Sequence, residues 1–92
     1  MRILTPADVD AQLSKLPFWK IEDGALTRSL QFDDFRAAMR FVNRIADLAE
    51  KAGHHPDIDI RYNRVRLSLV SHDAGGLTMA DFELAAGIEE VI

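Results

Sequence analysis

The sequence predicts an α+β domain in which three helices pack on one face of a four-stranded antiparallel sheet, in the order α-β-β-α-β-β-α. Three observations support this. Two pairs of short segments alternate apolar and polar residues, as strands with one buried face do. A long segment between the pairs repeats its apolar residues at helical spacing. Two Thr-x-x-Asp motifs, one near each end of the chain, mark the starts of flanking helices.

Size and composition restrict the class of protein. The 92 residues are expected to form one domain, residues 1–92, with 48% hydrophobic and 28% charged residues. The chain has no cysteine, which excludes disulfides, thiolate nucleophiles and cysteine-ligated zinc. Its apolar runs are too short for a membrane span, and its start lacks a signal peptide's apolar core, so we expect a cytoplasmic protein. A net charge of −4 argues against a dedicated nucleic-acid binder.

The first half of the chain reads as a helix followed by a hairpin. A capping box that begins at Thr5 opens the helix, which we expect to end near Leu16. Residues 18–22 and 25–32 alternate as two strands. Asp23-Gly24 between them favours a type I′ turn, because both central positions of that turn need a positive φ.

The longest predicted element is a helix over residues 35–52. Asp33 or Asp34 can cap its start, and Gly53 suits the left-handed position that follows a helix. The apolar residues of this helix recur at a spacing of three or four: Phe35, Ala38, Met39, Val42, Ile45, Ala46 and Ala49.

A second hairpin and a last helix complete the chain. Residues 57–62 and 64–69 alternate as strands, and we place a two-residue turn at Asn63-Arg64. This register pairs every apolar residue with another and makes Tyr62 a core residue of the hairpin. The apolar pairs it predicts are Tyr62 with Val65, Ile60 with Leu67 and Ile58 with Leu69. A second capping box, Thr78 to Asp81, opens a helix that continues to about Val91.

The three histidines of the chain are its strongest candidates for chemistry. His54 and His55 follow the end of the long helix, and the predicted register places His55 opposite His72. On one interpretation, His54 caps the preceding helix, favoured by the helix dipole, and His72 is an ordinary surface residue. Metal binding is a second, which is disfavoured because adjacent residues in extended chain point apart. The favoured interpretation is acid–base catalysis, since the unperturbed pKa of histidine lies near neutral pH.

Three further residues are candidates for supporting roles. Glu50 lies near the end of the long helix and could orient a histidine through a hydrogen bond, although taken alone it is better explained as a solvated glutamate. Asp81 is accounted for by its capping box, and its functional interpretation is a carboxylate at the rim of a pocket. Trp19 is either a core residue or the aromatic wall of a pocket for a flat heterocycle.

These residues together resemble the signature of the pterin-4a-carbinolamine dehydratases. Glu50, the run His54-His55-Pro56, Tyr62, His72 and Asp81 match the family's pattern E-x3-H-H-P-x5-Y-x9-H-x8-D at every position. The likeness extends over roughly residues 17–92 and includes Phe32-Asp33-Asp34-Phe35, Ala49-Glu50-Lys51, Tyr62-Asn63-Arg64-Val65 and Gly76-Leu77-Thr78.

The resemblance implies a function as well as the same fold. It implies a hydro-lyase that removes water from a 4a-hydroxytetrahydropterin to give the quinonoid dihydropterin, in recycling of the cofactor of aromatic amino acid hydroxylases. His54, His55 and His72 would form the active site, with Glu50, Asp81 and Trp19 supporting it and no metal or other cofactor. A homodimer or homotetramer is expected, functionally coupled to a pterin-dependent hydroxylase. The alternative is a non-catalytic role on the same fold, in dimerisation, assembly or transcriptional coactivation.

Overall fold

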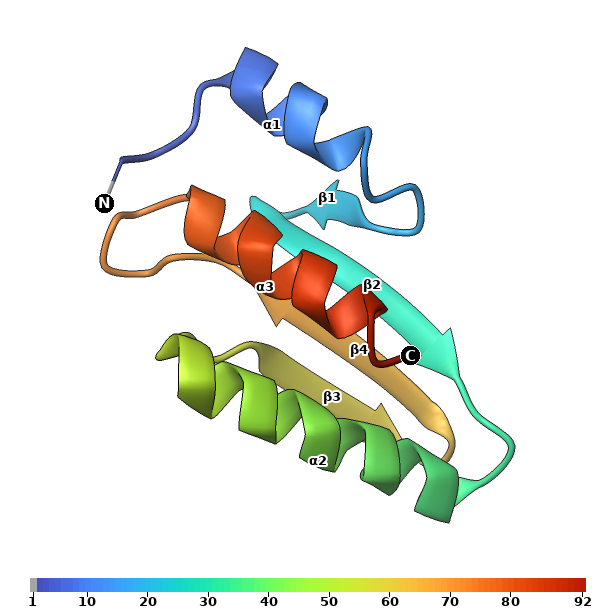
Figure 1. Ribbon diagram of the computed structural model, residues 1–92. Coiled ribbons are helices and arrows are strands. Elements are labelled where there is room, and N and C mark those ends of the chain that lie inside the picture. The colour runs from blue at the N-terminus through green and yellow to red at the C-terminus, as the bar shows by residue number, and fades with distance from the viewer. Residues whose placement is uncertain (1) are drawn as a thin grey trace.

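The computed structural model describes residues 2–92 and has the predicted order of elements (Figure 1). The elements are α1 (Pro6–Leu13), β1 (Lys20–Glu22), β2 (Ala25–Gln31), α2 (Phe35–Ala52), β3 (Asp57–Arg61), β4 (Arg64–Leu69) and α3 (Met79–Glu89). The strands form one antiparallel sheet in the order β1-β2-β4-β3. The predicted α+β fold is therefore confirmed.

The predicted caps set the helix ends. The Thr5 hydroxyl accepts the Asp8 N–H at 3.1 Å, and the Asp8 carboxylate accepts the Thr5 N–H in return. The Asp34 carboxylate caps α2 by accepting an N–H from its first turn at 2.7 Å. Gly53 follows α2 with φ 62°, the left-handed conformation that glycine adopts without steric cost. Helix α1 is shorter than predicted and ends at Leu13.

The first hairpin forms as the sequence predicts. Asp23 and Gly24 have φ of 51° and 78°, as a type I′ turn requires, and Glu22 pairs with Ala25. Strand β1 is shorter than the predicted strand 18–22 and begins at Lys20.

The predicted register of the second hairpin is wrong by two residues. Strand β3 pairs Ile58 with Leu67 and Ile60 with Val65, so the turn consists of Tyr62 and Asn63. A slip of two residues keeps each side chain on the same face, because side chains alternate along a strand with a period of two. The apolar pattern therefore fits both registers equally well.

A contact from outside the hairpin accompanies this register. The Asn63 side chain donates to the carbonyl of Phe32 at 2.8 Å, and the Phe32 N–H donates to the carbonyl of Asn63 at 2.8 Å. The connection between β2 and α2 thus holds Asn63 at the turn. Its neighbour Tyr62 takes φ 54° and is 67% exposed, so the interpretation of Tyr62 as a core residue is wrong.

The core lies between the sheet and the helices α2 and α3, which run antiparallel on the same side of the sheet (Figure 1). Alternate residues of β4 are buried on this side, while its arginines are exposed on the opposite face. Helix α1 packs Val9 and Leu13 against the edge of the same core. No helix within residues 2–92 has both the length and the apolar character needed to cross a bilayer. The antiparallel arrangement brings the end of α2 close to the start of α3.

The hairpin register leads to a stability prediction. Leu67→Ala should lower the free energy of unfolding by about 2–5 kcal/mol, because it opens a cavity at a fully buried position. Tyr62→Ala should change it by about 0.5 kcal/mol or less, because the side chain lies in solvent. Urea denaturation of the two variants measures both values. Equal losses would place Tyr62 in the core after all.

Candidate active site

Three parts of the chain meet at one end of the α2–α3 pair. They are the residues after α2, the loop after β4 and the first turn of α3. A cavity of about 550 Å³ lies there. It is lined by Ala52, Gly53, His54, His55, Val70, Ser71, His72, Asp73, Ala74 and Ala80. All three histidines therefore line one cavity, although the observed register, continued outward, places Ser71 and not His72 next to the pair.

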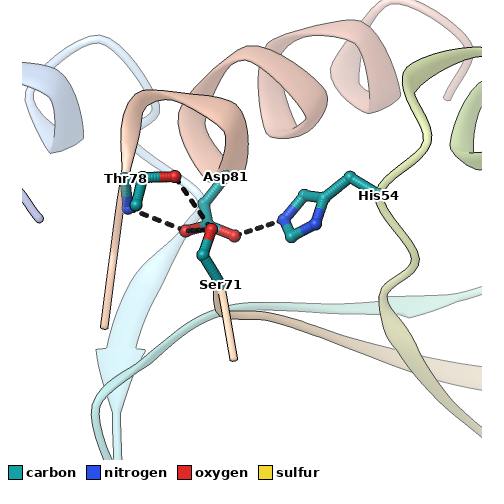
Figure 2. Close-up of polar contacts among 4 residues, drawn as sticks. All are labelled: His54, Ser71, Thr78 and Asp81. Carbon is teal, nitrogen blue, oxygen red and sulfur yellow. Dashed lines mark hydrogen bonds and ion pairs between the residues drawn. The ribbon is translucent and has the colours of Figure 1, made fainter. Parts of the chain in front are cut away.

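His54 is held at the bottom of this site by a buried carboxylate. Its backbone N–H donates to the carbonyl of Ala49, which closes the end of α2. Its Nε2 lies 2.5 Å from Oδ1 of Asp81 (Figure 2). The His54 side chain is 18% exposed and that of Asp81 is 0% exposed. This pair links the end of α2 to the first turn of α3.

Asp81 is satisfied on both of its oxygens. Oδ2 accepts the hydroxyl of Ser71 at 3.0 Å and the backbone N–H of Thr78 at 2.9 Å, while Oδ1 faces His54 (Figure 2). The bond from Thr78 belongs to the predicted capping box. Since Asp81 is fully buried beneath His54 and does not line the cavity, its predicted place at the pocket rim is wrong.

This arrangement selects one tautomer of His54. An ionised carboxylate only accepts hydrogen bonds, so a neutral His54 bonded to ionised Asp81 carries its proton on Nε2 and donates a hydrogen bond to Oδ1. In the neutral ring Nδ1 is then an acceptor with no hydrogen-bond partner among residues 2–92, and Figure 2 shows it pointing away from Asp81. An imidazole oriented in this way can accept a proton, and the carboxylate stabilises the resulting imidazolium.

His55 has a partner of a different kind. Its Nε2 bonds to Oε2 of Glu50, which lies on the last turn of α2. The two side chains are 63% and 77% exposed. Water and salt compete with an exposed ion pair, so Glu50 orients His55 only weakly compared with the buried contact at His54. Glu50 therefore contacts a histidine, as the sequence suggested.

His72 lies in the loop between β4 and α3. The loop is closed by hydrogen bonds to the backbone of Ser71, including one of 2.9 Å from the Gly75 N–H to the Ser71 carbonyl. The imidazole of His72 is exposed and has no hydrogen-bond partner among residues 2–92. It is free to contact a molecule that enters the cavity.

Trp19 lies away from the cavity. Its indole N–H donates to Oε1 of Glu89 at 2.7 Å, at the end of α3 opposite the site, and the same oxygen accepts from Nε of Arg28 at 2.6 Å. Trp19 is buried in the core. It joins the start of β1 to α3, and the predicted aromatic wall of the pocket is not formed by Trp19 within this chain.

Ser71 is the site residue that the sequence did not reveal. A serine before a histidine carries no signal of its own, and only the observed register places it next to His54. Across residues 2–92, no group of three or more His, Cys, Asp or Glu side chains is arranged to hold a metal ion.

Comparisons with known proteins match the chain over nearly its whole length to one family. The model of the family described as pterin 4 alpha carbinolamine dehydratase matches residues 2–91. A protein of Acidobacterium capsulatum, provisionally named as a pterin-4-alpha-carbinolamine dehydratase, is 60% identical over 92 residues, and the match covers 100% of both chains.

Two solved structures resemble the fold. A Brucella melitensis protein described as a transcriptional coactivator/pterin dehydratase has a TM-score of 0.93 and 35% identity, with 98% of each chain covered. A pterin dehydratase-like protein described as a RuBisCO assembly factor of the alpha-carboxysome has a TM-score of 0.64 and 22% identity. It covers 79% of this chain and 84% of its own, and it shows the fold alone. The match to the family model and the full-length relative show that the chain belongs to the pterin-4-alpha-carbinolamine dehydratase family.

Proposed function

We propose that the protein dehydrates a 4a-hydroxytetrahydropterin to the quinonoid dihydropterin and water by histidine acid–base catalysis. The observation that carries this proposal is the convergence of His54, His55 and His72 on one cavity, with His54 backed by the buried Asp81. Family membership supplies the class of substrate, and the site supplies the groups that move protons.

The reaction needs one proton donor and one proton acceptor. The hydroxyl on C4a takes up a proton and leaves as water, N5 loses its proton, and the electron pair of the N5–H bond forms the new C=N bond. Protons alone are transferred to and from the enzyme, so the elimination requires no redox cofactor. Acid and base groups positioned at the two atoms typically contribute about 10²–10⁴-fold each.

The different partners of the adjacent histidines suggest a division of roles. His54 has an Nδ1 acceptor without a partner in the described part of the chain and a carboxylate that stabilises its charged form, so we assign it as the base that takes the N5 proton. His55 bonds to Glu50 through Nε2, so in the charged ring its Nδ1–H is available to protonate the leaving hydroxyl. His72, on the facing loop, would orient the pterin.

The physiological partners follow from the substrate. A pterin-dependent hydroxylase supplies the 4a-hydroxy compound, and a reductase consumes the product. Strands β1 and β3 are the two edges of the sheet, and edges of this kind are natural pairing sites for a homodimer or homotetramer.

A second candidate function is coactivation of transcription by binding another protein. The similarity to the Brucella melitensis structure, whose description names a transcriptional coactivator as well as a pterin dehydratase, favours it. The two functions can coexist in one protein, because the histidine site does not include the exposed arginines of β4 on the other face of the sheet.

The decisive experiment is a rapid assay with a freshly generated 4a-hydroxytetrahydropterin, in which ultraviolet absorbance follows the quinonoid product. We expect dehydration well above the uncatalysed rate, in proportion to the concentration of protein. A rate equal to the background would reject the enzyme and leave the coactivator function as the better candidate.

The exposed histidine gives a clean test of catalysis. His55→Ala should lower kcat by about 10²–10⁴-fold, because it removes the proposed acid. The free energy of unfolding should change by about 0.5 kcal/mol or less, since the side chain lies mostly in solvent. Kinetics and urea denaturation of the same preparation measure both. Full activity in this variant would remove His55 from the mechanism.

The two carboxylates should differ in their effect on kcat. Asp81→Asn should lower kcat on the order of 10²-fold or more, because the buried partner of His54 loses its charge. Glu50→Gln makes the same chemical change at an exposed pair and should lower kcat by less than about fivefold. Circular dichroism confirms that each variant is folded before its kinetics are measured. A larger loss in Glu50→Gln would reverse the assigned ranking of the two pairs.

A further inference from the structure

Ser71 occupies the centre of the polar network beneath His54. Its Oγ lies 3.0 Å from Oδ2 of Asp81 and 2.8 Å from Oγ1 of Thr78 (Figure 2). The carboxylate only accepts, so the single hydroxyl proton of Ser71 points to Asp81, and Ser71 accepts from the hydroxyl of Thr78. The donors form an ordered chain from Thr78 through Ser71 to Asp81, which His54 approaches from the other side.

The backbone of the same residue closes the loop that carries His72. The Ser71 carbonyl accepts the N–H groups of Ala74 at 3.1 Å, Gly75 at 2.9 Å and Gly76 at 3.3 Å, and the Ser71 N–H donates to the Gly76 carbonyl at 3.2 Å. Ser71 is thus in contact with both parts of the site. Its side chain reaches the carboxylate behind His54, and its main chain shapes the loop of His72.

We propose that Ser71 is a positioning residue that fixes the Asp81 carboxylate, and through it the tautomer and orientation of His54. The torsion that rotates an aspartate carboxylate has a broad energy profile, so hydrogen bonds set the plane of the group. Oδ2 of Asp81 receives one bond from the Thr78 N–H and one from Ser71. Without the Ser71 hydroxyl, Oδ2 keeps only the bond from the Thr78 N–H, and the carboxylate can turn away from Nε2 of His54.

The geometry distinguishes this role from nucleophilic catalysis. A serine nucleophile donates its proton to a histidine that acts as its base. Ser71 donates instead to the Asp81 carboxylate, and its oxygen accepts from Thr78. The residue is also buried. Its effect on the dehydration rests on the proposed function, whereas its effect on His54 does not.

The test compares Ser71→Ala with Ser71→Thr, which keeps the hydroxyl, and with Ser68→Ala. Ser68 lies on β4, three positions before Ser71 in the sequence, and is not among the residues that bond to Asp81. Nitrogen NMR of the imidazole rings reports the tautomer without any substrate. We expect wild type, Ser71→Thr and Ser68→Ala to show a single His54 tautomer protonated at Nε2, and Ser71→Ala to show a mixture.

Kinetics provide the second readout. We expect kcat of Ser71→Ala to fall roughly tenfold with KM changed less than about twofold, and Ser71→Thr to recover most of the rate. If Ser71→Ala does not fold, Ser71→Cys, which keeps a side chain of similar shape but donates weakly, takes its place with the same expected result.

The outcomes separate this inference from the proposed function. An unchanged His54 tautomer in Ser71→Ala or Ser71→Cys overturns the positioning role, whatever the activity. A mixed tautomer in a protein that does not dehydrate any pterin keeps the positioning role and rejects the proposed function. A loss of thermal stability alone, with tautomer and kcat as in wild type, would show that Ser71 is structural only.

Discussion

The site depends on one constraint, the need to satisfy a carboxylate that is completely removed from water. An isolated charge in the interior is very unfavourable, so Asp81 must find donors for both oxygens. It finds them on three elements: the Thr78 N–H at the start of α3, the Ser71 hydroxyl after β4 and the His54 ring after α2. The same bonds that satisfy the charge therefore hold together the three segments that line the cavity.

This constraint also explains how two adjacent histidines acquire different properties. The side chains of His54 and His55 have different partners. His54 turns inward onto a buried acceptor, and His55 turns outward to Glu50 in solvent. In the proposed reaction, one histidine with a buried carboxylate partner and one with an exposed partner suit an elimination that removes a proton from one atom and donates a proton to a group beside it.

The features that the sequence predicted well are those set by near neighbours. The capping boxes at Thr5 and Thr78, the Asp23-Gly24 turn and the left-handed Gly53 all formed where expected. The second hairpin was displaced because a slip of two residues satisfies the apolar alternation equally well. In the observed register, Asn63 bonds to Phe32, about thirty residues earlier in the chain. The alternation of residues within the hairpin cannot predict such a distant contact.

The order of the elements and their caps could be read from the sequence, since these depend on interactions over a few residues. The hairpin pattern also placed three histidines near one of its ends. The partner of each candidate site residue depends instead on how the elements pack together. His54 and Asp81 are 27 positions apart and Trp19 and Glu89 are 70 apart. Such pairs form only when packing of α3 on the sheet brings their elements together. That packing placed Trp19 in the core away from the cavity and Ser71 beneath His54, where its hydroxyl reaches the buried charge.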